Sequence, residues 1–307
     1  MISVIIPCYN YGHLIGDSLN SLIQQTFSDF EVIVVNDGST DRTEEIVSRL
    51  ADRDNRIKLY SFPNRGLAAS RNIGIELAKG KFIQFLDADD LLEKKKFEIQ
   101  VKIFQDHPLS DIVYGSVRYF KEDPYNPADR MFTYWGVNKE WMPKFTGNGQ
   151  SFLSTALKGN FSHLSSALFR KELVDKIGEF DDEISAVADY HYLLRCVIDN
   201  AAFYYADLPE TYSLVRWHTN NMSKDPNFMR EQEIVMRKKL RQFLLHDTDA
   251  TDTNEHAIKG LSLYINKSWK TVFMSGGKFD SIKKLISDLG LYRIARKIFY
   301  ASRSNDI

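Results

Sequence analysis

The first 120 residues alternate short β-branched runs with amphipathic stretches, and this rhythm is the strongest constraint on the fold. The runs SVIIP, EVIVVND, IKLYSF, KFIQFLD and DIVYGSVRYF have the composition of strands. Between them, the spacing of apolar residues predicts helices over about residues 13–25, 41–53, 67–79 and 91–106. Strands that alternate with helices build βαβ units, so the sequence predicts an α/β fold with a central, mostly parallel sheet flanked by helices.

Polar residues follow several of these strands directly. The segments PCYN (7–10), NDGS (36–39) and DADD (87–90) each begin where a predicted strand ends. In open parallel sheets, ligands bind outside the carboxyl ends of the strands. The sequence therefore predicts one site at this edge, to which all three segments contribute.

The segment DADD gathers carboxylates at positions 87, 89 and 90. Two carboxylates about 4 Å apart repel by roughly 4 kcal/mol at the effective dielectric of a protein surface, so such a cluster favours a bound cation or shared protons. The residues alone leave a second interpretation open, in which Asp89 or Asp90 caps a helix that begins near Leu91.

Composition narrows the class of protein. The 307 residues are 43% hydrophobic and 26% charged, which is typical of a soluble globular chain and long enough for either one large domain or a domain plus an appendage. Lys and Arg total 40 against 41 Asp and Glu, so we expect no nucleic-acid partner. Cys8 and Cys196 are too few for a disulfide framework and suit a reducing compartment. With no apolar leader and no run of 18 apolar residues, a cytoplasmic protein is expected.

After Phe120 the rhythm ends. Residues 121–160 are rich in Pro, Gly, Asn and aromatics, and we interpret them as a long functional loop region. The segments HLSSALFR, AFYYAD and ETYSLVRWH then favour strands, and a helix is expected in the second half of residues 178–199. From about residue 227 the chain is helical in pattern and polar.

Four ordered segments resemble glycosyltransferase family 2, the inverting enzymes of the GT-A fold: VIIPCYN, VIVVNDGSTDRT, GLAASRNIGIELAKGKFIQFLDADD and FRKELVDKIGEFDDEI. The resemblance covers roughly residues 1–220. It implies a Rossmann-like GT-A domain over 1–220, with a nucleotide-binding half (1–120) and an acceptor-binding half (121–220). Residues 221–307 would then form a helical C-terminal extension.

The resemblance also implies a donor site for a nucleotide sugar, commonly a UDP-sugar. Asp37 would accept a hydrogen bond from the uracil imide, or alternatively form an Asx turn before Gly38. Arg71 would lie near the nucleotide, or alternatively form a helix-surface ion pair. Arg216 would clamp phosphate oxygens, and His218 would donate to them or join the metal. The residues so assigned to the nucleotide sugar are Pro7, Tyr9, Asp37, Arg71, Asp87, Arg216 and His218.

A divalent cation is the cofactor that the resemblance implies. Asp87 would face the ribose and the metal, and Asp89 would be a direct metal ligand, while Asp90 would cap the next helix. Oxygen ligands suit manganese or magnesium. The bound cation would neutralise the clustered carboxylates and the charge that develops on the leaving diphosphate.

Inverting transfer also needs a general base that takes the proton of the acceptor hydroxyl. The family supplies the Asp of a Glu-Asp pair at the start of a helix, and the matching segment here is AVADYHYLLR. Asp189 is therefore the expected base, with Ala188 in place of the usual Glu. Asp189 is also a candidate helix N-cap. Asp181 and Asp182 are competitors, interpreted as acids that order their loop.

The predicted function is transfer of a sugar from a nucleotide-sugar donor to a saccharide or lipid-linked acceptor, in the synthesis of a bacterial-type surface polysaccharide. The alternative is a catalytically inactive GT-A-fold module that binds a nucleotide sugar or acts as a scaffold, suggested by Ala188 and the helical tail. The joint presence of Asp37, Asp87, Asp89 and Asp189 argues against this alternative. A sugar nucleotidyltransferase is disfavoured, because PCYNYGHL is not a Gly-rich, basic phosphate loop.

Two further features leave alternatives open. Residues 278–303 carry seven basic and two acidic residues with apolar residues near helical spacing. Such a stretch can make peripheral contact with an anionic membrane, or pack on its own domain with a solvated basic face. Tyr134, Trp135 and Trp141 could stack on an acceptor sugar, or simply fill the core.

Overall fold

The computed structural model of the chain describes residues 1–133, 139–218 and 221–273. The chain divides into two compact units, Met1–Ile258 and Lys259–Ile307. The basic stretch at 278–303, together with Tyr134 and Trp135, lies outside the described residues. Within the described ranges, none of the helices combines the length and the apolar character needed to span a bilayer.

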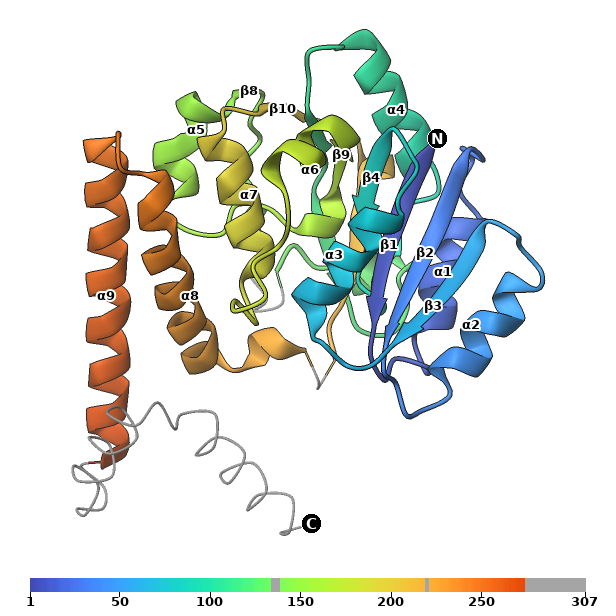
Figure 1. Cartoon of the computed structure of the whole chain (residues 1–307), viewed down its shortest axis with the longest axis horizontal. Coiled ribbons are helices and arrows are strands. Elements are labelled where there is room, and N and C mark those ends of the chain that lie inside the picture. Colours follow the sequence, from blue (N-terminus) through green and yellow to red (C-terminus); the bar gives the residue numbers. More distant parts are fainter. Residues whose placement is uncertain (134–138, 219–220, 274–307) are drawn as a thin grey trace. The chain divides into compact units, whose positions relative to one another are not determined.

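The N-terminal part alternates strands and helices, as the hydrophobic rhythm predicts (Figure 1). Its elements are β1 (Ile2–Cys8), α1 (Ile15–Ile23), β2 (Phe30–Asp37), α2 (Thr43–Ala51), β3 (Ile57–Phe62), α3 (Leu67–Leu77), β4 (Phe82–Phe85), β5 (Leu91–Leu92), α4 (Lys96–Asp106), β6 (Ile112–Tyr114) and β7 (Val117–Phe120).

The remaining part supplies short strands and several helices. Its elements are η1 (Pro127–Asp129), β8 (Gly147–Asn148), α5 (Gly149–Ala156), η2 (Leu164–Ser166), β9 (Ala167–Arg170), α6 (Lys171–Ile177), α7 (Ala188–Ile198), β10 (Ala202–Tyr205), η3 (Pro209–Thr211), β11 (Ser213–Arg216), η4 (Met222–Lys224), α8 (Pro226–Leu240), η5 (Arg241–Phe243) and α9 (Thr248–Phe273). The elements labelled η are single 3₁₀ turns. The predicted helical character of the C-terminal region is confirmed by α8 and α9.

The central sheet has eight strands in the order β3-β2-β1-β4-β9-β6-β10-β8. Strands β3, β2, β1 and β4 pair in parallel, and so do β6 and β10. Strand β9 is antiparallel to both of its neighbours, β4 and β6. A second sheet of three strands, β5-β11-β7, pairs β11 in parallel with β7. The prediction of an α/β fold with a mostly parallel sheet is therefore confirmed.

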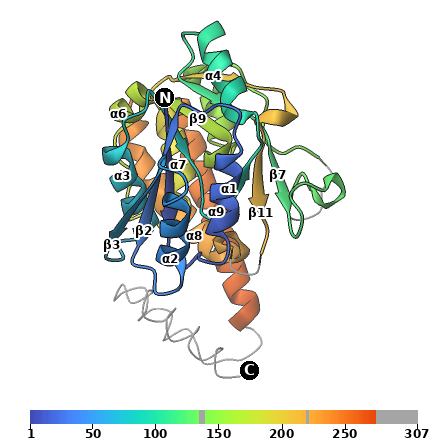
Figure 2. The same ribbon diagram turned by 90° about the vertical axis from the view of Figure 1, so that its right-hand side faces the viewer.

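Alternate residues of the buried strands serve two hydrophobic cores, because successive side chains in a strand point to opposite faces. Ile2, Val4 and Ile6 of β1 pack in one core with apolar residues of α1, α2 and α4. Ile5 of β1 and Ile33 of β2 pack in the other with residues of α3, α6 and α7. Figure 2 shows α3 and α6 on the opposite side of the sheet from α1 and α2.

Two sequence-based boundaries were wrong. The helix predicted over 91–106 begins at Lys96, because Leu91 and Leu92 form β5 and pair with β11. The run DIVYGSVRYF is two strands that belong to different sheets, separated at Gly115. A Cβ at Gly115 would lie 2.4 Å from Thr211 Oγ1, so only glycine permits this close approach.

The region 121–160 contains more regular structure than the sequence predicts. Helix α5 begins at Gly149, where an added Cβ would lie 2.3 Å from the carbonyl oxygen of Val197 in α7. Phe152 and Leu153 of α5 join the core beneath α7. Trp141 packs against the same core, which favours the core-filling interpretation of this residue. Tertiary packing therefore forms a helix that local composition does not indicate.

A buried lysine joins three parts of this fold. Lys96 in the first turn of α4 is fully buried, and its Nζ donates to the carbonyl oxygens of Ser166 (2.7 Å) and Thr211 (3.3 Å). Among the described residues, no carboxylate pairs with it. Burial lowers the pKa of Lys96 well below its ordinary value. The amine thus connects α4 with η2 and η3. Its burial disfavours its charged form.

We predict that Lys96→Met flattens the pH dependence of stability. Between the lowered pKa of Lys96 in the folded chain and about 10.4, the unfolded chain binds a proton that the folded chain lacks. The free energy of unfolding therefore rises with pH in this window, by up to about 1.4 kcal/mol per pH unit from this group. Urea denaturation of wild type and Lys96→Met between about pH 8 and 10 measures the difference in slope. The exposed Lys94→Met is the matched control, and equal slopes for wild type and Lys96→Met would contradict the prediction.

Candidate functional site

The loops that follow β1 and β2 lie together at the carboxyl edge of the sheet. Asn10 Oδ1 accepts from the backbone N–H of Thr40 (2.8 Å), and Ser39 Oγ accepts from the N–H of Asn10 (2.9 Å). Asp41 Oδ2 accepts from the N–H of Gly12 (2.9 Å). The parallel register pairs Cys8 with Asn36, so both strands end at the same level. Two of the three predicted polar strand ends are thereby joined.

The acidic segment after β4 is anchored by an arginine from α3. Arg71 is 3% exposed, and its Nη2 lies 2.8 Å from Asp87 Oδ1. Burial by itself would raise the pKa of Asp87, but the charges of Arg71 and His163 outweigh burial and lower it. Arg71 is therefore a buried partner of the acidic segment and not a helix-surface ion pair, and Asp87 is held ionised.

The end of β11 reaches the other two carboxylates. His218 Nε2 lies 2.8 Å from Asp89 Oδ2, and the backbone N–H of Arg216 donates to Asp90 Oδ1 at 3.0 Å. The Arg216 guanidinium donates from Nε to the carbonyl of Asp89 (3.2 Å) and from Nη2 to Asp17 on α1 (2.7 Å). The predicted phosphate-binding pair and the acidic segment thus form one cluster, although 126 positions separate Arg216 from Asp90.

Asp90 does not cap the helix that follows, which corrects the sequence-based expectation. The N-cap position of α4 is Lys95, because β5 intervenes between the acidic segment and the helix. Asp90 is instead 2% exposed, and its burial, together with the charges of Asp89 and Asp87, raises its pKa well above the ordinary value. Three carboxylates in this space disfavour full ionisation unless positive charge is added.

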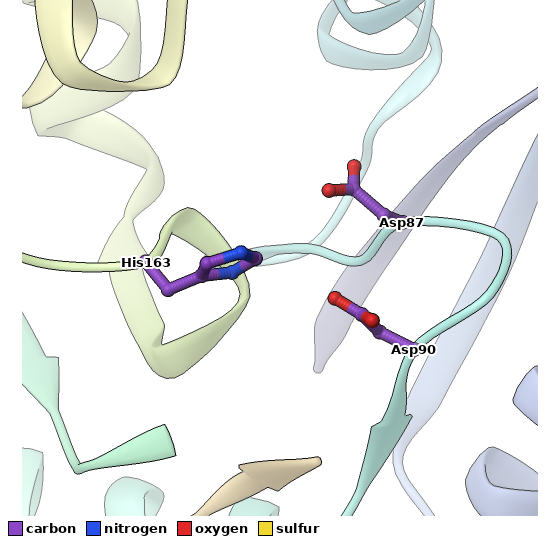
Figure 3. A group of neighbouring side chains, drawn as sticks. All are labelled: Asp87, Asp90 and His163. Carbon is purple, nitrogen blue, oxygen red and sulfur yellow. The ribbon is translucent and has the colours of Figure 1, made fainter. Parts of the chain in front are cut away.

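His163 belongs to the same cluster and was missed by sequence reasoning. Figure 3 shows its ring facing the carboxylates of Asp87 and Asp90. One ligand atom from each of the three residues lies within 4.8 Å of the other two. Because carboxylate oxygens and an imidazole nitrogen are suitable ligands for a divalent cation, the residues present fit the metal that the acidic motif implies.

The pairing of β9 with β4 is the feature that would have revealed the position of His163. Strand β9 runs antiparallel to β4, with Gln84 opposite Leu168. The turn η2, which precedes β9, therefore lies near the end of β4, where the acidic segment begins. The sequence run HLSSALFR gave no indication of which strand it would pair with, so the contact followed only from the strand order.

Asp189, the predicted base, is the second residue of α7 and is half-buried. Burial raises its pKa, the charges of His163 and Arg71 lower it, and the charge of Asp87 raises it; the net shift is upward. Asp189 is therefore coupled electrostatically to Arg71, His163 and Asp87. It is not the N-cap of α7, which is Val187.

The neighbours of Asp189 have structural roles. Ala188 is 4% exposed and packs in the core, where a glutamate side chain would bring a charge among apolar groups. Asp181 accepts from Lys239 Nζ of α8 at 2.7 Å, whereas Asp182 is exposed. The interpretation of Asp181 as an acid that orders its loop agrees with this ion pair.

The remaining predicted donor residues lie at the ends of β1 and β2. Pro7 is buried within β1, and Tyr9, just beyond it, is 47% exposed. Asp37 is 5% exposed, and its two oxygens accept from the backbone N–H groups of Arg65 (2.7 Å) and Gly66 (2.9 Å). Asp37 therefore shapes the turn before α3, and each of its oxygens retains a second lone pair.

The sequence profile of glycosyl transferase family 2 matches residues 3–178. Among relatives, the glycosyltransferase GlyG of Streptococcus pneumoniae is 27% identical over 215 residues, covering 66% of this chain and 69% of GlyG. The chondroitin synthase of Pasteurella multocida is 37% identical over 198 residues, covering 56% and 20% of the respective chains. The chain spans only 15 to 44% of the length of five further relatives, all named uncharacterised glycosyltransferases.

Solved structures share the fold. TarS of Staphylococcus aureus, residues 1–349 in complex with UDP-GlcNAc, superposes with a TM-score of 0.66 at 21% identity, covering 94% of this chain and 79% of that one. The mannosyltransferase PcManGT of Pyrobaculum calidifontis, in complex with GDP-Man and Mn²⁺, gives 0.58 at 19% identity, covering 96% and 82%. These likenesses establish a GT-A-type fold, and with the profile match over more than half of its length, the chain belongs to glycosyl transferase family 2.

Proposed function

We propose that this chain transfers a sugar, with inversion, from a nucleotide-sugar donor to an acceptor hydroxyl. One observation carries the proposal. One cluster contains the groups suited to a diphosphate and its cation, which lie at residues 87–90 and 216–218. The charges of Arg71, His163 and Asp87 around this cluster also shift the pKa of Asp189. Binding of a nucleotide alone would not require a half-buried carboxylate beside the donor groups.

The donor is proposed to be a UDP-sugar, which the TarS complex with UDP-GlcNAc supports by analogy of fold. Asp37 would accept from the uracil imide through its remaining lone pairs, beside Pro7 and Tyr9. Arg71 would keep Asp87 ionised toward the ribose.

Arg216 is proposed to bind the diphosphate in place of its present ion-pair partner, Asp17. Its present partner, Asp17, is 56% exposed, and such surface ion pairs contribute little to stability. A diphosphate can therefore replace Asp17 at little cost and gain bidentate contacts with the guanidinium. His218 is held beside this position by Asp89.

A divalent cation, manganese or magnesium, would be held by the carboxylates of Asp87 and Asp89. When bound, it would stabilise the negative charge that develops on the diphosphate as the glycosidic bond breaks. The raised pKa of Asp90 supports this assignment, since the clustered carboxylates lack enough positive charge from protein groups alone.

Asp189 would act as the general base. Its carboxylate would accept the proton of the acceptor hydroxyl while the hydroxyl oxygen forms a bond to the anomeric carbon. The bond between that carbon and the diphosphate oxygen breaks, and its electron pair stays with the diphosphate. Because attack and departure take place on opposite faces, the configuration inverts.

The alternative of an inactive binding or scaffolding module receives little support from the site. Ala188 occupies a packed core position, so the absence of the usual Glu follows from packing and does not require loss of activity. We propose that the acceptor is a saccharide or a lipid-linked molecule. We further propose that the chain acts in the cytoplasm in the synthesis of a surface polysaccharide, by analogy with the chondroitin synthase that it resembles. The division into nucleotide-binding (1–120) and acceptor-binding (121–220) halves stays a proposal.

We predict that UDP binding depends on a divalent cation through Asp89. Calorimetry with Mn²⁺ should show UDP binding to Asp89→Ala weakened by about 10-fold or more, because the cation that bridges protein and diphosphate is lost. With a chelator, wild type and Asp89→Ala should bind UDP equally. The exposed Asp52→Ala serves as the matched control and should behave as wild type. UDP affinity that responds to neither chelator nor Asp89→Ala would exclude a metal-dependent donor site.

We predict that Asp189→Asn abolishes transfer while leaving donor binding intact. Asparagine preserves the size of the side chain but cannot accept the proton, and loss of a general base typically costs about 10²–10⁴-fold in rate. UDP affinity and melting temperature should stay near wild type. Asp181→Asn and Asp182→Asn are the matched comparisons. If either of these loses transfer while Asp189→Asn retains it, the base lies in the EFDDE segment.

The raised pKa of Asp189 also predicts the pH profile. The carboxylate must be ionised to accept a proton, so kcat should fall as pH drops through its folded pKa, which lies above the ordinary value of about 3.9. Asp87 should not contribute to this fall, because Arg71 keeps it ionised in this range. The residual activity of Asp189→Asn should lack the acidic limb. An identical limb in both proteins would assign it to another group.

A further inference from the structure

His163 is held in place more firmly than a loop residue needs to be. The carbonyl groups of Ser165 and Ser166 in the adjacent turn η2 accept from four buried side chains of three other elements, β4, α4 and β11. The donors are Gln84 Nε2 (2.8 Å) and Ser213 Oγ (2.7 Å) to Ser165, and Lys96 Nζ (2.7 Å) and Gln100 Nε2 (3.2 Å) to Ser166. The carbonyl of His163 itself accepts from Ser166 Oγ (2.7 Å).

This anchoring matters for the imidazole because a turn fixed by buried hydrogen bonds leaves its side chains little freedom to lose on binding. Lys96 and Gln84 lie in α4 and β4, on either side of the acidic segment in the sequence. The same hydrogen bonds therefore fix the position of His163 relative to Asp87 and Asp90.

The spacing between these three residues is compatible with a shared cation. Their ligand atoms lie within 4.8 Å of one another, yet in the described ranges no hydrogen bond joins His163 to Asp87 or Asp90. Neighbouring and opposite ligands of an octahedral cation with bonds of about 2.1 Å lie roughly 3.0 and 4.2 Å apart. Figure 3 shows the imidazole facing the two carboxylates, which come from the opposite side.

Each of the three groups also has one atom engaged by the protein and one left over. Asp87 Oδ1 pairs with Arg71, and Asp90 Oδ1 accepts from the N–H of Arg216. His163 Nδ1 lies 2.9 Å from Ser165 Oγ, which leaves Nε2. Histidines that bind metals are typically oriented by such a hydrogen bond at the other ring nitrogen. Asp89 is arranged in the same way, because its Oδ2 lies beside Nε2 of His218.

We infer that Nε2 of His163, together with Asp87 and Asp90, is a protein ligand of the divalent cation, in addition to Asp89. The inference rests on the proposed function, because the cation acts there on the donor diphosphate. On this inference, the buried hydrogen bonds around η2 hold an imidazole ligand at a fixed distance from the acidic segment.

The test is Mn²⁺ binding to the full chain, with and without UDP, measured from the electron paramagnetic resonance signal of free Mn²⁺. His163→Ala should weaken Mn²⁺ binding by at least about 10-fold. His163→Cys should bind Cd²⁺ better relative to Mn²⁺ than wild type does, because a thiolate favours the softer ion. His256→Ala is the control, since His256 is exposed on α9 and its Nδ1 lies 3.1 Å from the carbonyl oxygen of Asp252. Melting curves without metal establish that each variant is folded.

Mn²⁺ affinity of folded His163→Ala equal to that of wild type would overturn the inference. If, in the same experiment, Asp89→Ala loses Mn²⁺ and metal-dependent UDP binding, the proposed function stands and only the role of His163 is wrong. If wild type binds UDP but no Mn²⁺, both the ligand assignment and the metal dependence of the proposed function are wrong.

Discussion

The accumulation of carboxylates at the end of β4 is the constraint on which the site depends. Asp87, Asp89 and Asp90 repel one another in a partly buried space, so their ionisation requires positive charge nearby. The chain supplies it from distant segments: Arg71 from α3, and Arg216 and His218 from the end of β11. The fold therefore brings the acidic segment and the basic residues of the predicted donor site together, and the basic residues offset the repulsion between the carboxylates.

Strand order determines which further groups meet this cluster. Because β9 enters the sheet antiparallel beside β4, the chain that leads into β9 passes the acidic segment and places His163 against it. The same neighbourhood is stabilised by Lys96, whose amine serves the backbone of η2 and η3 and so joins the segments before β9 and before β11. Burial disfavours the charged form of this amine, and its two hydrogen bonds to backbone carbonyls connect the segments.

The fold places the proposed donor groups and the proposed base on different elements. The proposed donor groups lie at strand ends and on β11, whereas Asp189 lies in the first turn of α7, on a helix packed in the opposite core from α1 and α2. Ala188 contributes to that core, so packing fixes the start of the helix, and the pKa of the adjacent carboxylate responds to the charges of His163, Arg71 and Asp87. Ala188 thus packs the start of α7 into the core, while the neighbouring Asp189 stays half-buried and is the proposed base.

Hydrophobic periodicity and the polar residues at strand ends are local properties, so the α/β fold, the mostly parallel sheet and the polar strand ends can be predicted from the sequence. The motifs shared with family 2 also indicate Arg71, Asp87, Asp189 and His218 as candidate site residues. Three features depend on long-range contacts: Asp90 is buried against Arg216 and caps no helix, Gly115 divides one apparent strand between two sheets, and His163 faces the carboxylates. These features depend on contacts between segments far apart in the chain, where antiparallel insertion of β9 and close backbone approach override what each segment favours alone.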